Sequence, residues 1–243
     1  MQTIEKTVRE IALENPSSIR VFETLGIDYC CGGKRSLSEA CSLAEIDIDK
    51  TLALLEQAEL DRRSGQTSEW VTRPLSELIA HIMEHHHAFV RRETERLVGM
   101  LAKISAKHGP TRPEIPQIQS LFLVMAQELS THLLKEEQVL FPHIERLEKA
   151  AESGAPAPVA FFGSVAGPIS NMAAEHDDAG AILAQLRELS NGYTPPEGAC
   201  PTFVGLYSGL EDFEHDLHQH VHLENNILFP RATELERARQ ARS

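Results

Sequence analysis

The segments HLLKEEQVLFP at residues 132–142 and HVHLENNILFP at residues 220–230 decide the fold of this 243-residue chain. Each combines a histidine and a glutamate four residues apart with apolar residues at helical spacing. Residues at positions i and i+4 project from the same face of an α-helix. One imidazole and one carboxylate therefore replace consecutive residues of a stripe that is otherwise apolar.

An apolar stripe of this kind faces the core of a helix bundle. His132 and Glu136 lie on one stripe, His220 and Glu224 on another, and His176 alone on a third. Carboxylates are almost never fully buried without a partner, so these side chains require positive charge at their centre. We predict a metal site, and two carboxylates with imidazoles suit a pair of iron, manganese or zinc ions. The other predicted core positions of the three stripes are Phe122, Met125, Leu129, Val139, Ile169, Met172, Ala179, Leu183, Leu186, Phe203, Leu206, Leu210, Phe213, Leu217 and Ile227.

Four long helical patterns occupy residues 73–243, separated by loops that contain Pro and Gly. They run from Pro74 to about His108, from about Pro116 to Glu148, from Pro168 to Ser190, and from about Cys200 to Leu228. Pro142 should kink or break the second pattern, because proline lacks the N–H that an interior helix position donates. Four long amphipathic helices in succession predict an up-and-down bundle, and the expected fold class is all-α.

Residues 1–60 are predicted to form a separate small domain of three or four short helices. Ser36 and Glu39 have the spacing of a capping box, which begins one of them. A glycine-rich turn at residues 28–35 contains the adjacent Cys30 and Cys31. Residues 61–72 are polar and lack a helical period, so we expect an interdomain linker there.

The composition excludes several classes of partner. With 23 Lys and Arg against 36 Asp and Glu, the formal charge is −13. Nucleic acid and anionic membranes attract clustered Lys and Arg, so neither is expected as a partner. No apolar run approaches the roughly 20 residues that span a bilayer, and the N-terminus lacks the apolar segment of a secretory signal. We expect a cytoplasmic protein.

The first long pattern contains several histidines, and spacing alone does not identify which of them faces the core. Counting forward from Leu75 places His86 on the apolar stripe, whereas counting backward from Leu101 places His87 there. His81 and His85 have no assigned role. Five further histidines lie off the stripes or near helix ends and are expected at the surface or behind the ligands: His108, His143, His215, His218 and His222.

Over essentially its whole length the chain resembles the RIC (repair of iron centres) family of the ScdA/YtfE type. DYCCGGK at 28–34 resembles the signature of that family's N-terminal domain, and EHDDAG at 175–180 resembles a further metal helix. The resemblance implies a hemerythrin-like four-helix bundle with two non-heme iron ions and an oxo or hydroxo bridge. It also favours His87 as the ligand, since family members typically carry tyrosine at the place of His86. The implied ligands are His87, His132, Glu136, His176, His220 and Glu224, with the two glutamates bridging the irons.

The function implied by the resemblance is repair of iron–sulfur clusters damaged by nitrosative and oxidative stress. The resemblance leaves open whether the protein delivers iron, handles nitric oxide at the di-iron centre, or does both. It also leaves open whether the centre reduces nitric oxide. Cys30 and Cys31 would pass on iron or a nitrosyl group, while Glu128 and Glu175 would support the ligands or line a polar route to them. The partners would be damaged iron–sulfur proteins and nitric oxide or O2, and the sequence leaves open whether the chain forms a homodimer. The alternative is a hemerythrin-like module that binds or senses O2 or nitric oxide without turnover. The cysteine pair favours repair, because a pure binding bundle has no need of it.

Overall fold

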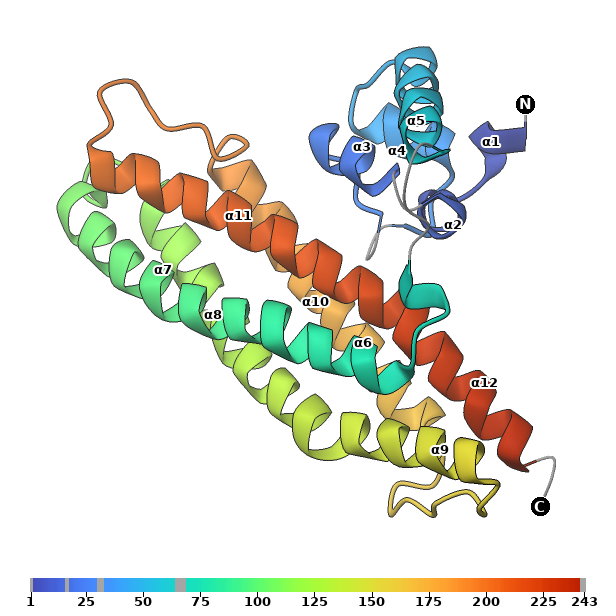
Figure 1. The fold of residues 1–243 in the computed structure, drawn as a ribbon. Coiled ribbons are helices and arrows are strands. Elements are labelled where there is room, and N and C mark those ends of the chain that lie inside the picture. Colours follow the sequence, from blue (N-terminus) through green and yellow to red (C-terminus); the bar gives the residue numbers. More distant parts are fainter. Residues whose placement is uncertain (1, 16–17, 30–32, 64–68, 241–243) are drawn as a thin grey trace.

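The computed structural model describes residues 2–15, 18–29, 33–63 and 69–240. Apart from two isolated β-bridges, the regular structure of these residues is helical, which confirms the all-α class. Four long helical rods form a bundle, and a small helical unit at the N-terminus lies beside it (Figure 1). Among the described residues, none of the helices is both long enough and apolar enough to cross a membrane.

Each rod except the third contains a π-helical turn. The first rod consists of α6 (Leu75–His81), η2 (Ile82–His87) and α7 (Ala88–His108), and the second of α8 (Glu114–Lys135), η3 (Glu136–Leu140) and α9 (Phe141–Ser153). The third is α10 (Ala166–Leu189), and the fourth consists of α11 (Pro201–Leu223), η4 (Glu224–Leu228) and α12 (Phe229–Gln240). α8 packs against α7 and α10, and α11 packs against α7. The apolar stripes meet in two buried clusters, one around Phe122 and Phe213 and the other around Met172 and Ile227.

Proline ends neither the second nor the fourth rod. The second rod does not break at Pro142 but changes direction between α8 and α9, which agrees with the predicted kink (Figure 1). The fourth rod continues beyond Leu228 to Gln240, contrary to the sequence prediction. In both rods a phenylalanine N–H donates to the glutamate carbonyl five residues earlier, in place of the usual four. The following proline then lies in the first turn of a new α-helical segment, where its missing N–H costs nothing.

In the described part of the small unit the structure has five helices: α1 (Gln2–Glu5), α2 (Val8–Glu14), α3 (Ser18–Thr24), α4 (Leu37–Leu43) and α5 (Ile48–Arg63). The predicted capping box of Ser36 and Glu39 is present, and Thr7 and Glu10 form a second one. α5 continues to Arg63, and the short 3-10 helix η1 (Glu69–Val71) also lies within the stretch predicted to be a linker. Arg231 of α12 donates hydrogen bonds to the carbonyls of Trp70 and Arg73, which hold the end of this stretch against the bundle.

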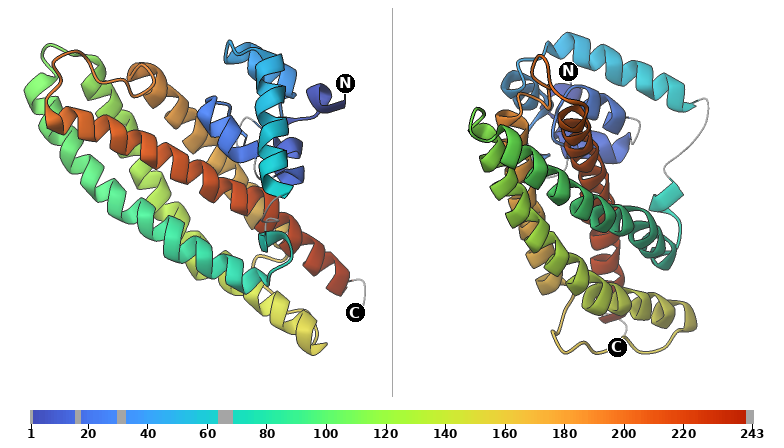
Figure 2. Two further views of the ribbon diagram at one scale, coloured as in Figure 1. Left: turned by 45° about the horizontal axis from the view of Figure 1, so that its top comes forward. Right: turned by 90° about the vertical axis from the view of Figure 1, so that its left-hand side faces the viewer.

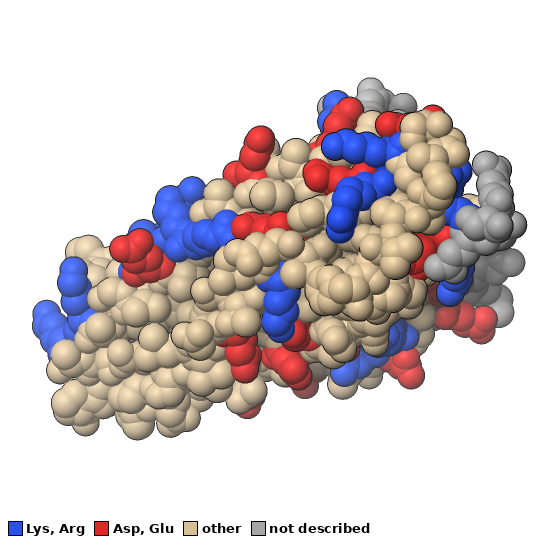
Figure 3. All heavy atoms as spheres, turned by 90° about the horizontal axis from the view of Figure 1, so that it is seen from below, with Lys and Arg blue, Asp and Glu red and all other residues tan. Residues whose placement is uncertain are grey.

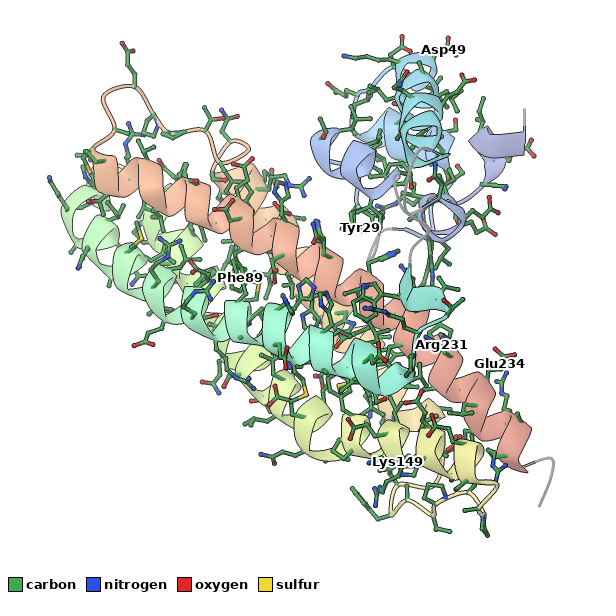
Figure 4. The ribbon with its side chains drawn as sticks, in the orientation of Figure 1. Tyr29, Asp49, Phe89, Lys149, Arg231 and Glu234 are labelled. Atoms are coloured by element: carbon green, nitrogen blue, oxygen red, sulfur yellow. The ribbon has the colours of Figure 1, made fainter. Side chains whose placement is uncertain are left out.

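The small unit is docked on α10 and α11 (Figure 2). Arg187 of α10 donates to the carbonyl oxygen of Gly26 at 3.1 Å. Tyr29 is fully buried and projects from the small unit towards α11, where its ring meets those of His218 and His222 edge-on (Figure 4). His218 and His222 are therefore buried beneath the small unit and do not lie at the surface.

The remaining off-stripe histidines differ in their surroundings. His143 is also fully buried, so of its two expected places, at the surface or behind the ligands, the surface is wrong; Phe162 of the loop after α9 lies edge-on to its ring. His108 is half-buried at the end of α7, and His215 is exposed.

On the face in Figure 3, acidic and basic side chains are interspersed, and one end of the bundle is largely uncharged.

Candidate metal centre

The three π-helical turns all contain a candidate ligand. η2 ends at His87, while η3 begins at Glu136 and η4 begins at Glu224. Single π turns within α-helices are rare and occur frequently at functional sites. In a π turn the N–H donates to the carbonyl five residues earlier instead of four. The turn therefore contains one extra residue, and the apolar stripe after it is shifted by one position.

This insertion explains why the sequence allowed two positions for the first-rod histidine. The stripe before the π turn and the stripe after it differ in phase by one residue, so both His86 and His87 are buried. The same shift makes one predicted core position wrong. In the second rod Leu140 is 2% exposed and belongs to the core, whereas Val139 is only half-buried.

The six candidate ligands converge at the centre of the bundle, and each is at most 2% exposed. They form two groups of four whose ligand atoms lie within 4.8 Å of one another. The two glutamates belong to both groups. The first group is His87, Glu136, His220 and Glu224, and the second is His132, Glu136, His176 and Glu224.

Each glutamate divides its two oxygens between the two histidine pairs. Glu136 Oε2 lies 3.5 Å from His87 Nε2, and Glu136 Oε1 lies 3.4 Å from His132 Nε2. Glu224 Oε1 lies 3.0 Å from His220 Nε2, and Glu224 Oε2 lies 3.2 Å from His176 Nε2. Both carboxylates thus have the arrangement of a bridge between two neighbouring cations.

The outer nitrogens of three of the histidines contact acceptors behind the centre. His87 Nδ1 lies 2.7 Å from a Glu137 oxygen, and His132 Nδ1 lies 2.8 Å from a Glu175 oxygen. Each acceptor can receive a hydrogen bond, so in the neutral ring Nδ1 carries the proton and Nε2 presents its lone pair to the centre. Metal-binding histidines are typically oriented in this way.

The third histidine follows the same arrangement with an amide as the acceptor. His176 Nδ1 lies 3.1 Å from Asn225 Oδ1. Sequence reasoning missed both Glu137 and Asn225, although each directly follows the glutamate of a histidine–glutamate pair. Arg9 of the small unit donates to the Asn225 carbonyl at 2.8 Å, so the small unit contacts the residue that supports His176.

The centre contains buried charge that the described residues do not satisfy. Both oxygens of Glu136 and one oxygen of Glu224 are buried without a hydrogen-bond partner among the described residues. Leaving a buried carboxylate unpaired is costly, and bound cations remove that cost. Four imidazoles and two carboxylates suit iron, manganese or zinc, so these residues fit a pair of such ions.

The electrostatics of the cluster favour ionised carboxylates. Burial alone would lower the pKa of His87, but the neighbouring carboxylates of Glu136 and Glu224 outweigh it and raise this pKa to about 10. Burial alone would also lower the pKa of His132. The negative charge of Glu136 is the main opposing effect, and the pKa of His132 is raised to about 9. Burial and their mutual repulsion oppose ionisation of the glutamates, yet the histidines hold both carboxyl pKa values below the usual range. A cation entering the centre must therefore displace protons from imidazoles.

A pocket of about 340 Å³ between α8 and α10 reaches His132 of the second histidine pair. Glu128, His132 and Glu175 are among its lining residues. Glu128 is exposed at this pocket, whereas Glu175 contacts His132 directly and forms an ion pair with Lys135. The two glutamates singled out from the sequence thus lie on one approach to the centre. Cys30 and Cys31 lie outside the described residues.

Comparison with known proteins gives matches along most of the chain. The hemerythrin HHE cation-binding domain matches residues 78–232, and a domain of unknown function, DUF542 (ScdA_N), matches residues 4–59. The iron-sulfur cluster repair protein YtfE of Pectobacterium atrosepticum is 38% identical over 94% of this chain and 96% of its own length. YtfE of Citrobacter koseri is 38% identical and that of Escherichia coli O81 is 37% identical, with the same coverage of both chains. These matches confirm the resemblance that the sequence motifs indicated.

Proposed function

We propose that this chain, which belongs to the hemerythrin HHE cation-binding family, repairs damaged iron–sulfur clusters with a pair of iron ions held in its bundle. The observation that carries the proposal is the division of each buried glutamate between two histidine pairs. Relatives named for iron–sulfur cluster repair, similar over nearly the full length of both chains, support repair as the function. We further propose a cytoplasmic location and damaged iron–sulfur proteins as the partners.

In this proposal His87 and His220 hold one non-heme iron, and His132 and His176 hold the other. Glu136 and Glu224 bridge them, together with an oxo or hydroxo bridge. Such a pair, when bound, supplies a redox-active centre that can take up nitric oxide or O2 and can release iron. Six protein ligands for two ions leave room for such a small ligand.

The chain's own residues contribute orientation and exclusion of water. Phe141 stacks on His87 with ring centroids 5.7 Å apart, and Phe229 stacks on His176 at 6.2 Å. These rings close the centre on the side of α9 and α12. The pocket lined by Glu128 and Glu175 would then be the polar approach to the second iron for small ligands or for iron itself.

The deciding experiment measures iron content and repair in the same preparation. Anaerobically reconstituted protein should bind close to two irons per chain, and its oxidised form should absorb in the near-ultraviolet as an oxo-bridged pair does. Added to an iron–sulfur enzyme inactivated by nitric oxide, it should restore activity faster than the same amount of free ferrous iron. Saturation at one metal per chain would rule out the paired centre. Full iron loading without any recovery would favour the gas-binding or sensing module.

The first-rod ligand is tested by two neighbouring substitutions. His87→Ala should lower the bound iron by about half and change the near-ultraviolet spectrum, because His87 belongs to one of the two groups. His86→Tyr should leave both irons in place, because His86 Nδ1 contacts Asp216 and its ring lies behind His220. Metal analysis and absorption spectra of both variants check this assignment. The reverse pattern would show that the ligand position is off by one residue.

A further inference from the structure

The backbone carbonyl of Asn225 has no hydrogen-bond donor within its own rod, because a π turn and a proline occur together there. Phe229, four residues after Asn225, donates its N–H to the Glu224 carbonyl instead. The residue five after Asn225 is Pro230, which has no N–H. This proline costs the α-helical segment that it begins nothing, but it leaves the Asn225 carbonyl of the preceding turn without a partner. Backbone carbonyls that are shielded from water normally have one.

Arg9 of α2 supplies the missing donor from the small unit. Its guanidinium donates to the Asn225 carbonyl at 2.8 Å, in a partly buried contact. Hydrogen bonds from a charged donor are stronger than those between neutral groups. Since η4 begins at Glu224, the π turn that positions this bridging carboxylate is completed by a residue of another part of the chain.

Arg9 is itself fixed by the backbone of the small unit. Its N–H donates to the Gly33 carbonyl at 2.9 Å, and the N–H of Val8 donates to the Arg35 carbonyl at the same distance. A side chain on Gly33 would collide with the Tyr29 carbonyl, so glycine permits the close approach of these segments. Arg9 therefore stays with the small unit and contacts the bundle only while that unit is docked.

Asn225 passes this contact on to one of the candidate ligands. Its side-chain oxygen, Oδ1, lies 3.1 Å from His176 Nδ1 and orients that ring. Removing the partner that orients a metal-binding histidine typically weakens metal binding by about 10–100-fold. In the other half of the centre, His87 is oriented by Glu137 of the second rod. The small unit thus acts on the half that contains His176.

A cavity of about 600 Å³ lies at the same contact, between the small unit and the bundle. Arg9, Asn225 and Phe229 are among the residues that line it. Phe229 stacks on the ring of His176, and Asn225 contacts its Nδ1. Two side chains that touch His176 therefore also line this cavity, so a shift of η4 would open His176 to solvent.

We propose that Arg9 is a positioning residue through which docking of the small unit controls how firmly the His132–His176 half of the centre holds its metal ion. In the docked state Arg9 completes the hydrogen bonding of η4, and Asn225 keeps His176 directed to the centre. When the small unit separates from the bundle, both effects are lost and this half releases its ion. That the ion is iron rests on the proposed function, whereas the coupling applies to any cation bound there.

The release test compares iron-loaded wild type with Arg9→Met, which keeps an unbranched stem beside Gly33 but removes the donor. In excess chelator, one of the two irons should leave Arg9→Met about 10-fold faster than wild type, as expected for the loss of an orienting partner. The near-ultraviolet absorption of the pair should decay with that first iron. Circular dichroism should show the helical content of wild type. Arg35→Ala is the matched control, since Arg35 is an exposed arginine of the small unit.

The assignment to one half is tested in two single-iron backgrounds. His87→Ala leaves the histidines of the His132–His176 half intact, and His132→Ala leaves those of the other half. Adding Arg9→Met should speed iron release from the first background and not from the second. Equal acceleration in both backgrounds, or none in the first, would overturn the coupling. A wild type that retains both irons but restores no iron–sulfur enzyme would instead contradict the proposed function.

Discussion

Replacing Glu136 with alanine is expected to remove both irons and to lower the melting temperature of the iron-loaded protein by about 10 °C. Glu136 belongs to both groups of ligand atoms, so its loss affects the two ions together, unlike the loss of His87. A ligand present at about 1,000 times its dissociation constant contributes about 4 kcal/mol to stability. In a chain of this size about 1 kcal/mol corresponds to 2–4 °C. Iron analysis and thermal unfolding followed by circular dichroism measure both effects.

Comparing Glu136→Ala with wild type needs two controls: a variant that lacks a glutamate elsewhere, and both proteins without iron. Glu95→Ala removes an exposed glutamate of α7 and should change neither iron content nor melting temperature. After removal of iron by a chelator, Glu136→Ala and wild type should melt at closer temperatures, because most of the difference comes from bound metal. Glu224→Ala should behave as Glu136→Ala does. A Glu136→Ala protein that retains two irons would contradict the bridging role.

Replacing Cys30 and Cys31 together with serine is expected to abolish or sharply slow recovery of a nitrosylated iron–sulfur enzyme without loss of bound iron. All six candidate ligands lie in the bundle, so the thiols are not needed to hold metal. Tyr29, the residue before the pair, packs against His218 and His222 of the helix that also carries His220. The pair is therefore joined in sequence to a residue docked on a metal-binding helix.

The measurement compares the double variant with wild type in three assays: iron content, melting temperature and the rate of enzyme recovery. Only the last should change. Cys41→Ser is a useful contrast, since Cys41 is buried in the small unit and should affect stability more than repair. Repair by the double variant at the wild-type rate would remove the thiol relay and favour the gas-binding module. Loss of iron would mean that the cysteines ligate metal directly.

The pair His132–Glu136 and the pair His220–Glu224 could be recognised from the sequence because their spacing is local. Residues four apart share a helix face whatever the rest of the chain does. The apolar residues around them specify which face is buried, and so the all-α bundle and the convergence of His176 with both pairs follow from periodicity. The first-rod histidine was different, since a π turn inside the pattern changes the phase that periodicity relies on.

The sequence by itself therefore determined the class of fold, the rods and the ligand types that meet at their centre. Only the tertiary structure decided which atoms surround those ligands. Glu175 and Asn225 lie on different rods from the histidines that they orient, and His218 and His222 are buried because a small unit far away in sequence docks on them. Such contacts join residues distant along the chain, and no local spacing encodes them. The π turns likewise lie where buried ligands converge, since η2 ends at His87 and η3 and η4 begin at Glu136 and Glu224.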